Sequence, residues 1–446
     1  MSTKFKNFTD FILRHKKKSI FALAVTIAGG NALNSKIKDD ELRRFYGEKA
    51  KHFGSIPIHP NQKLRKVIVL INNEAKRRNA AKLFNKNSLP LLNLAGIDVN
   101  IINVSTQSEL ENIARAIDYK EADCIFLVGG DGTVCHALNG IFQKQNLNEQ
   151  LPIGLFPGGN RNKSFSMLGF LKKSVDPQSN TRLCCESTMA LIGGRQEQFY
   201  PICCRIENIS DKENKEKTEN VSSISLPSVN YLLSEIALGW FEHCELKAPT
   251  FWWMGPLNIY FTYFWEFFKI SPKAPIRVEI VYEEFCSGCR KCVKLPTNNG
   301  SFLSWLFGTN VKQGNPKLLK LVERENLSCG ELHSIAVSGT DVRLNFEQSE
   351  ISSKLKLKIV VTLGMLGTLR EAWRKSRAIN NLEKPLIVDN FDTNIEAKKI
   401  ILHFTDIPEK LRKLTISGES FDFSDYLEKE IIIESMRQPL QFFVPN

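Results

Sequence analysis

The sequence contains Cys124-Ile-Phe-Leu-Val-Gly-Gly-Asp-Gly-Thr133, in which a short apolar run leads directly into a glycine-rich turn. A continuous apolar run of this length is typical of a β-strand that is buried on both faces. Glycines allow the backbone to approach a ligand closely and to adopt positive φ angles. We expect a helix to begin at Thr133, and its free N–H groups and positive dipole end would attract phosphate. The pattern therefore predicts a phosphate site, although one such turn can equally be a simple strand–helix connection.

A second glycine turn follows the next predicted strand, in Phe156-Pro-Gly-Gly-Asn-Arg-Asn162. The carboxyl ends of parallel strands meet at one edge of a sheet, and ligands bind there, so the two turns together favour a binding site. Neither turn matches the Rossmann or P-loop spacing. Asp131 stands in the middle of the first turn. An acid in an anion site would suit magnesium handling or proton removal from an attacking hydroxyl.

Strands and helices alternate on both sides of this region, which predicts an α/β domain with a parallel sheet. The expected strands are 67–71, 99–104, 124–128 and 153–156, and the expected helices are 79–94, 109–117 and 133–142. Gly96 is a plausible stop for the first of these helices.

From about residue 186 the strand-like runs follow one another without helices between them, which predicts a β-rich, largely antiparallel second domain. These runs are 189–192, 202–206, 278–282, 335–338, 342–346, 359–363, 400–404 and 431–434. Residues 207–223 are expected to form a mobile loop, and residues 283–330 a second irregular insertion. The predicted organisation is a leader over 1–60, a catalytic α/β domain over 61–185 and the second domain over 186–446.

Basic residues are concentrated at the N-terminus of this 446-residue chain, whose formal net charge is +12. Residues 1–38 hold eight lysines and arginines and one acid, Asp10, so this segment carries seven of the twelve charges. The nearly balanced remainder disfavours a nucleic-acid partner. A basic, acid-poor leader before the modest apolar run Ser19–Leu33 suits a mitochondrial signal or a shallow membrane anchor. The alternative is a soluble helix packed on the protein's own core.

Three further features have competing interpretations. Cys286, Cys289 and Cys292 have metal-like spacing, but with no second Cys/His pair evident nearby, free or partly oxidised thiols are favoured over structural zinc. Residues 250–268 include ten aromatic residues, and domain core is favoured over a lipid-facing surface. His136 is expected to serve only in packing.

The sequence resembles the diacylglycerol kinase catalytic domain of lipid kinases, in Phe126-Leu-Val-Gly-Gly-Asp-Gly-Thr133 and in the downstream Pro157-Gly-Gly-Asn160. The glycine motif alone is shared with NAD kinases and phosphofructokinases. Three other segments make the chain similar to the acylglycerol kinases in particular, almost from end to end: Leu83–Val99, Trp252–Ile259 and Phe421–Phe443.

The resemblance implies transfer of the ATP γ-phosphate, with Mg²⁺, to monoacylglycerol or diacylglycerol, giving lysophosphatidic and phosphatidic acid. Asp131 would activate the acceptor hydroxyl. The residues implied to hold nucleotide phosphates are Gly129, Gly130, Gly132 and Thr133, and those implied to line the nucleotide pocket are Gly158, Gly159, Asn160 and Asn72.

The chain departs from the family pattern in two places. Asn72-Asn-Glu-Ala75 stands where relatives have Asn-Pro followed by a glycine. The Asp-Gly-Glu triplet found late in many relatives is missing, and Asp422 is a candidate magnesium or nucleotide residue in its place, or else a surface acid.

The resemblance also implies a mitochondrial protein of the inner membrane, facing the intermembrane space. Two alternative functions stay open. One is a kinase-independent structural subunit of the inner-membrane carrier translocase. The other is a sphingosine or ceramide kinase.

Overall fold

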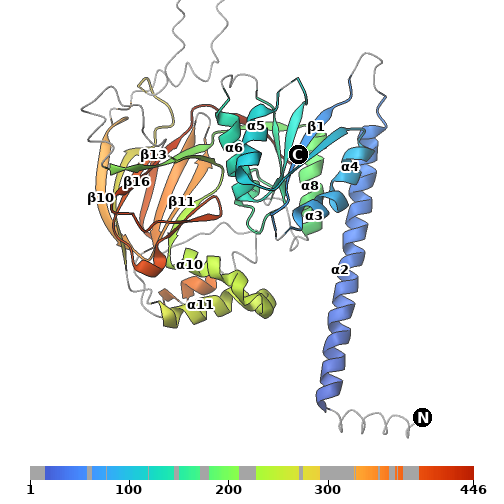
Figure 1. Ribbon diagram of the computed structural model, residues 1–446, viewed down its shortest axis with the longest axis horizontal. Helices are drawn as coiled ribbons and strands as arrows, with labels where there is room; N and C mark the ends of the chain where they lie inside the picture. Colours follow the sequence, from blue (N-terminus) through green and yellow to red (C-terminus); the bar gives the residue numbers. More distant parts are fainter. Residues whose placement is uncertain are drawn as a thin grey trace, which may run out of the picture.

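The computed structural model shows two β-sheets lying side by side, with a long N-terminal helix projecting from the first (Figure 1). The residues that the structure describes are 16–57, 63–76, 78–118, 120–144, 150–170, 180–209, 228–270, 275–291, 326, 328–349, 352–360, 367–368, 370–374 and 391–445.

The first sheet, sheet A, has six strands in the order β2-β1-β3-β4-β17-β5. The first five are parallel to one another, and β5 is antiparallel to β17. Their bounds are β1 Lys66–Asn72, β2 Asp98–Val104, β3 Cys124–Gly129, β4 Ile153–Pro157, β5 Gln196–Phe199 and β17 Leu440–Phe443.

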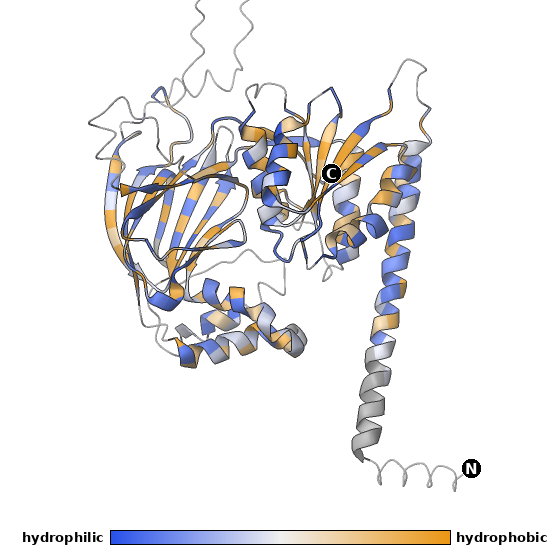
Figure 2. Ribbon diagram, in the orientation of Figure 1, coloured by the Kyte–Doolittle hydropathy of each residue, from blue (hydrophilic) through white to orange (hydrophobic). Residues whose placement is uncertain are grey.

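Both faces of sheet A are covered, which explains the apolar runs in its central strands. Along β1, Val67, Val69 and Ile71 enter one core cluster, whereas Ile68 and Leu70 enter the other. The central strands are accordingly apolar along their length in Figure 2, while many strands of the second sheet alternate.

Helices on the two faces of sheet A position the glycine turns. The helices in this part of the chain are α2 Lys16–Gly54, α3 Ala80–Asn87, α4 Leu89–Leu94, α5 Gln107–Ala116, α6 Asp131–Phe142, α7 Lys163–Met167 and α8 Asn180–Gly193. Helices α3, α4 and α8 share one core cluster with the end of α2, and α5 and α6 belong to the other cluster. Phe84, Phe126 and Phe156 pack edge to face in the first cluster, with ring centroids 5.7 to 6.2 Å apart. Full burial of each such ring contributes about 1.5–3 kcal/mol.

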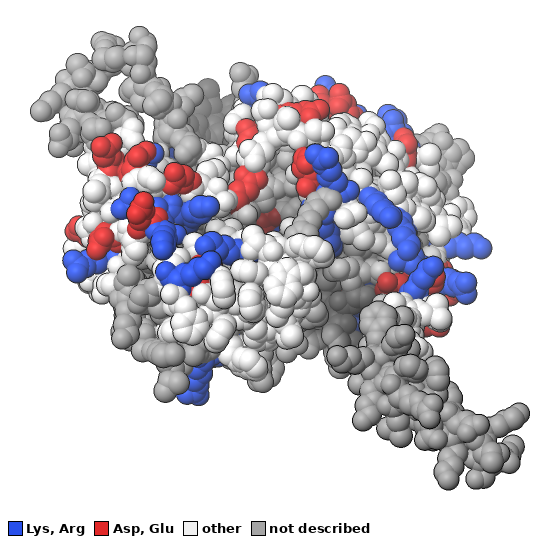
Figure 3. All heavy atoms as spheres, turned by 60° about the horizontal axis from the view of Figure 1, so that its bottom comes forward, with Lys and Arg blue, Asp and Glu red and all other residues white. Residues whose placement is uncertain are grey.

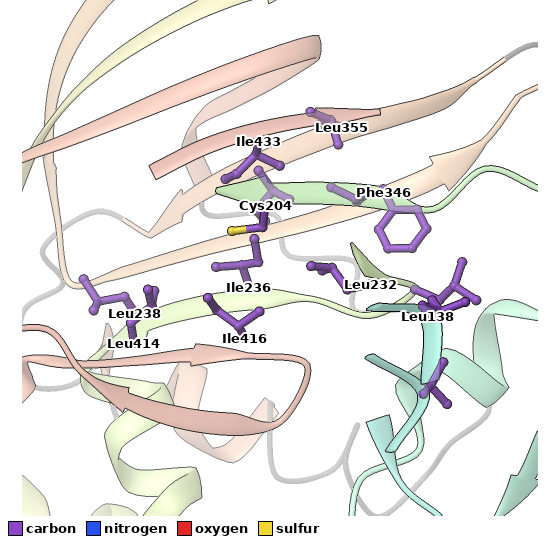
Figure 4. Packing of buried hydrophobic residues seen from close by; sticks show 14 of the residues in the cluster. Leu138, Cys204, Leu232, Ile236, Leu238, Phe346, Leu355, Leu414, Ile416 and Ile433 are labelled. Carbon is purple, nitrogen blue, oxygen red and sulfur yellow. The ribbon is translucent and has the colours of Figure 1, made fainter. Parts of the chain in front are cut away.

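The second sheet, sheet B, is antiparallel and has eleven strands, nine of them in the order β15-β14-β8-β11-β12-β13-β16-β6-β7, with β9 and β10 branching from β13. Its core is packed with aliphatic residues such as Ile236, Ile416 and Ile433 (Figure 4). The bounds are β6 Ile202–Asn208, β7 Ser228–Leu232, β8 Ile236–Gly239, β9 Ile276–Glu284, β10 Leu332–Gly339, β11 Asp341–Gln348, β12 Ser353–Val360, β13 Phe391–Asp406, β14 Lys413–Ile416, β15 Glu419–Asp422 and β16 Lys429–Ser435. This arrangement confirms the predicted fold class.

Sheet B carries a short helical layer at one end, which is seen at the bottom of Figure 1. It consists of α10 Trp240–Lys247, the 3-10 helix η1 Ala248–Leu257 and α11 Asn258–Lys269. A further 3-10 helix, η2 Glu409–Leu411, precedes β14.

The described part of the N-terminal leader consists mainly of helix α2, which packs near its C-terminal end against the helices on one face of sheet A. Tyr46 and Ala50 are buried there, and Arg43 donates a 2.8 Å hydrogen bond to Asn87. Among the described residues, none of the helices combines the length and apolar character needed to cross a bilayer. Residues 1–15 of the leader lie outside the described residues.

The structure corrects some details of the predicted elements. Residues 189–192 are not a strand but the end of α8, because a four-residue apolar run cannot be assigned to strand or helix by pattern alone. The predicted helix 79–94 is divided at Ser88, two residues before Pro90, which lacks a backbone N–H and is placed at the start of α4.

Other boundaries also differ from the sequence prediction. The strand expected at 359–363 is described only to Val360, where β12 ends. Most of the predicted loop 207–223 and much of the insertion 283–330 lie outside the described residues, although β9 extends to Glu284. Sheet A also contains β5 and β17, which lie beyond residue 185, the predicted end of the α/β domain.

Candidate active site

A cavity of roughly 630 Å³ opens at the carboxyl edge of sheet A, where the second domain approaches it. It is lined by Asn72, Glu74, Ala75, Lys76, Ser105, Thr106, Gln107, Gly130, Asp131, Gly132, Thr133, Gly159, Asn160, Arg161, Glu245, Leu246, Pro249, Ser417, Gly418 and Glu419. The cavity is therefore lined by seven of the nine predicted catalytic and nucleotide-binding residues, which lie at or just after the carboxyl ends of three strands of sheet A. Gly129 and Gly158 are not among the lining residues, nor is Asp422.

The two glycine turns pack directly against each other at the floor of this cavity. The N–H of Gly158 donates a 2.9 Å hydrogen bond to the carbonyl of Gly129. A Cβ added at Gly159 would lie 2.4 Å from Cα of Gly130, and one added at Gly129 would lie 2.2 Å from Oγ1 of Thr133. The expected positive φ is wrong for these glycines, which are absent from the positive-φ residues. Close contacts, with a facing backbone at Gly159 and with the Thr133 side chain at Gly129, require glycine here rather than unusual φ angles.

Asp131 is the first residue of α6, and its carboxylate is held by the backbone at the start of α7. Oδ1 accepts a 2.7 Å hydrogen bond from the N–H of Ser164, and Oδ2 accepts a 3.0 Å bond from that of Lys163. The residue is only 4% exposed. Burial raises the pKa of Asp131, and the two backbone hydrogen bonds partly oppose this rise. The helix begins two residues earlier than predicted, so the carboxylate lies in its first turn.

Asn72 lies at the end of β1 and connects it to the first glycine turn. Its Nδ2 donates a 2.9 Å hydrogen bond to Oγ1 of Thr133, while its Oδ1 accepts one from the N–H of Glu74. Lys76 also lines the cavity, with a positive φ of 51°. Lys76 was not predicted, although it closely follows the segment that departs from the family pattern.

The β14–β15 turn of sheet B covers the first glycine turn. Ser417 and Gly418 form this turn with φ angles of 51° and 77°, and a Cβ added at Gly418 would lie 3.8 Å from Cβ of Asp131. Glu419 follows and lies against Gly132. Asp422, at the far end of β15, is exposed and hydrogen-bonded to Ser424. The structure therefore places Glu419, and not Asp422, at the cavity. The segment Ser-Gly-Glu at 417–419 ends in the Gly-Glu of the Asp-Gly-Glu triplet, a match that the sequence prediction missed.

His136 holds this turn in place, which corrects its interpretation as a mere packing residue. Its Nδ1 is 2.6 Å from a carboxylate oxygen of Glu111 on α5, and its Nε2 is 3.1 Å from one of Glu419 on β15. Gln107 also donates to Glu419, at 3.1 Å. Burial disfavours the charged imidazole, but the two carboxylates outweigh it and raise the pKa of His136 above its ordinary value of 6.5.

We expect this contact to make the stability of the protein depend on pH. Because the folded pKa of His136 is raised, its contribution is complete below pH 6.5 and is lost as pH rises through the raised value. Thermal unfolding followed across this range should show that His136→Gln lacks this loss, whereas the exposed control His52→Gln retains it. Identical pH profiles for wild type and His136→Gln would contradict the assignment.

A buried network of charges joins the two domains beside Asp131. Arg343 on β11 lies 3.2 to 3.6 Å from carboxylate oxygens of four acids, namely Glu235, Glu242, Glu245 and Asp341. From the first domain, Arg161 is 2.7 Å from Glu242, and Lys163 pairs with Glu235. The carboxylates outweigh the effect of burial and raise the pKa of Arg343, while Arg343 and Lys163 lower that of Glu235 despite its burial. No sequence motif indicated this network.

The aromatic run forms an exposed surface, contrary to the favoured interpretation as core. Only a few of its members, such as Tyr263, are buried. We call its exposed members the aromatic surface: Trp252 (69% exposed), Trp253 (61%), Leu257 (58%), Phe264 (55%), Trp265 (43%) and Phe268 (68%). In Figure 3, which brings this end of the molecule forward, a broad uncharged area has lysine and arginine side chains along its margins. Leu246 and Pro249, which precede the aromatic surface in sequence, line the cavity.

Known proteins resemble this chain over different lengths. An uncharacterised protein of Caenorhabditis elegans is 28% identical, over 98% of this chain and 95% of that protein. Human mitochondrial acylglycerol kinase is 26% identical, over 60% of this chain and 58% of its own length. Sphingosine kinase 1 of Arabidopsis thaliana is 24% identical, over 48% of this chain and 39% of its own length.

Among solved structures, a diacylglycerol kinase from Bacillus anthracis covers 86% of this chain and 98% of that chain, with 13% identity and a TM-score of 0.47. Residues 66–192 match the diacylglycerol kinase catalytic domain. This segment contains both glycine turns and Asp131. The chain is therefore similar to lipid kinases, and its match to the catalytic domain of diacylglycerol kinases covers residues 66–192.

Proposed function

We propose that this protein transfers the γ-phosphate of ATP to the free hydroxyl of monoacylglycerol and diacylglycerol, giving lysophosphatidic and phosphatidic acid. The observation that carries the proposal is the buried Asp131 carboxylate at the N-terminus of α6, in a cavity bounded by both glycine turns. The choice of acceptor is supported by the similarity to acylglycerol kinases.

The cavity suits a nucleoside triphosphate and its Mg²⁺ ion. The first turn of α6 presents backbone N–H groups and a positive dipole end, and Lys76 adds a cation. Asp131 and Glu419 offer the carboxylate oxygens that Mg²⁺ prefers. When bound, Mg²⁺ neutralises charge that develops on the phosphates during transfer.

Asp131 is the proposed proton acceptor. As the acceptor oxygen attacks the γ-phosphorus and the bond to the bridging oxygen of ADP breaks, the hydroxyl proton passes to a carboxylate oxygen of Asp131. The N–H groups of Lys163 and Ser164 fix the orientation of this carboxylate. The raised pKa makes it a stronger base than an exposed aspartate, provided that it is ionised.

A panel of acceptors tests this function. Wild-type protein with ATP and Mg²⁺ is expected to phosphorylate mono-oleoylglycerol and dioleoylglycerol in detergent, with sphingosine and ceramide much poorer. The similarity to a sphingosine kinase makes sphingosine the necessary competitor. Phosphorylation of sphingosine alone, or of no lipid, would overturn the proposed acceptor class.

We further propose that the aromatic surface rests at the headgroup level of a membrane, where tryptophan rings are favoured. Its six large side chains are 43–69% exposed, and its sequence continues from residues that line the cavity. A lipid acceptor could then reach the cavity without crossing water.

Replacing Trp252 and Trp253 by serine should weaken binding to phospholipid vesicles. Loss of about 1.5 kcal/mol or more of apolar burial corresponds to weakening by about tenfold or more. The measurement is vesicle co-sedimentation, together with ATP affinity, which should not change. Leu427→Ser removes an equally exposed residue elsewhere and should bind like wild type. Unchanged co-sedimentation of the double variant with vesicles would contradict the proposed contact between the aromatic surface and the membrane.

We also propose a mitochondrial location, at the inner membrane facing the intermembrane space. The basic leader and the similarity to proteins named mitochondrial acylglycerol kinase support it. Imaging of a C-terminally tagged chain, followed by protease protection of isolated mitochondria, tests the compartment and the side.

A further inference from the structure

Three cysteines come together at one end of sheet B, away from the residues that line the catalytic cavity. Cys286 and Cys289 follow β9, and Cys329 precedes β10. Their sulfur atoms all lie within 4.8 Å of one another. The sequence prediction considered Cys286, Cys289 and Cys292 but not Cys329, which is 40 residues from Cys289 in the chain.

The strand register accounts for this meeting. β9 and β10 are antiparallel, with Glu283 opposite Leu332, so the segments after Glu283 and before Leu332 emerge side by side. The N–H of Phe285 also bonds to the carbonyl of Glu396 on β13, which fixes the first segment.

Both cysteine segments contain a glycine with a positive φ angle. Gly288 lies between Cys286 and Cys289 and has a φ of 127°, and Gly330 follows Cys329 with a φ of 93°. These φ angles are readily adopted only by glycine. These glycines allow each segment to bend, so that two thiols from the first segment and one from the second lie close together.

The surroundings suit thiolates that bind a metal ion. Cys289 is 1% exposed, and Nδ2 of Asn326 lies 3.6 Å from Sγ of Cys286. Ser328 fixes that amide, because its N–H and its hydroxyl both donate to Oδ1 of Asn326. Such a donor next to a ligand sulfur is the usual outer support of a metal site.

We propose that Cys286, Cys289 and Cys329 bind a structural Zn²⁺ ion. Tetrahedral zinc with Zn–S bonds of about 2.3 Å places sulfurs about 3.8 Å apart, which a small adjustment of these side chains achieves. None of these described cysteines is in a disulfide. Soft thiolate ligands favour zinc over the oxygen-seeking cations.

The ion would tie the end of β9 to the start of β10. Metal binding would thus contribute to the stability of sheet B. The sequence has a further cysteine at position 292, outside the described residues. The proposal depends only on the three cysteines that the structure brings together.

The test begins with the full-length wild-type chain, purified under reducing conditions, supplied with zinc and freed of unbound metal. Elemental analysis should find one zinc per chain, and X-ray absorption should show sulfur ligands at about 2.3 Å. Replacement by Co²⁺ should give sulfur-to-cobalt charge-transfer absorption. These measurements need no variant, so they decide the matter even if substituted chains fail to fold.

Variants then assign the ligands. Cys286→Ser, Cys289→Ser and Cys329→Ser should each lose the zinc or bind it at least about 10-fold more weakly. Cys203→Ser, at a cysteine buried in the same sheet, should keep it. Several results would overturn the proposal: no zinc in the wild type, nitrogen and oxygen ligands only, full zinc binding by Cys329→Ser, or a disulfide among the three in protein alkylated on isolation.

Discussion

Asp131→Asn is expected to lower the rate of phosphate transfer to mono-oleoylglycerol by about 10²–10⁴-fold, the usual contribution of a positioned base. The amide is nearly the same shape as the carboxylate but cannot accept the hydroxyl proton. Burial raises the pKa of Asp131, which means that its charge is less favourable in the folded state than in the unfolded state. Removing that charge should therefore not unfold the protein.

The measurement combines initial rates with nucleotide affinity and thermal unfolding. Asp123→Asn is a matched control, because Asp123 lies just before β3, at the other end of the strand that leads to Asp131. We expect the control to keep the wild-type rate. If Asp131→Asn retains the wild-type rate, another group accepts the proton. The wild-type rate should also fall as pH drops through the raised pKa, since the protonated acid cannot act as a base.

Arg343→Met is expected to lower the free energy of unfolding by about 3–5 kcal/mol, because it leaves buried acids without their cation. Arg343 is 6% exposed and approaches four carboxylates. Methionine fills much of the same volume, so the loss reports charge rather than a cavity. Denaturant unfolding monitored by tryptophan fluorescence measures it.

Arg195→Met provides the comparison, because Arg195 pairs with Glu197 at the surface, where both side chains are about half exposed. Such a pair contributes at most about 1 kcal/mol. A similar small loss for Arg343→Met would show that the buried network is not what holds the two domains together. If Arg343→Met cannot be purified, Arg161→Met, which removes a more exposed cation from the same network, gives the same comparison.

The local sequence pattern was sufficient to predict the central strands of sheet A and the glycine turns at their carboxyl ends. Val67–Ile71 and Cys124–Val128 are apolar because helices cover both faces of sheet A, and the glycine turns follow strands whose carboxyl ends meet. These features depend on neighbours close in sequence. The same reasoning was wrong at residues 189–192, where four apolar residues belong to a buried helix.

The rest of the site depends on contacts between distant segments. His136 and Glu419 are 283 residues apart. Three of the four acids around Arg343, namely Glu235, Glu242 and Glu245, are about 100 residues from it in the chain. The exposure of Trp252 and Trp253 could not be predicted either, because an aromatic-rich segment is compatible both with a buried core and with an exposed surface.

The sequence by itself determined the buried parallel strands, the two glycine turns and the position of Asp131 in the first of them. These features follow from local residue types, because apolar runs are buried as strands and glycines permit close backbone contacts. Only the tertiary structure decided that Glu419 covers that site, that Arg343 joins the domains and that Cys329 meets Cys286 and Cys289. The physical reason is that strand register and domain packing, which involve the whole chain, bring these side chains together.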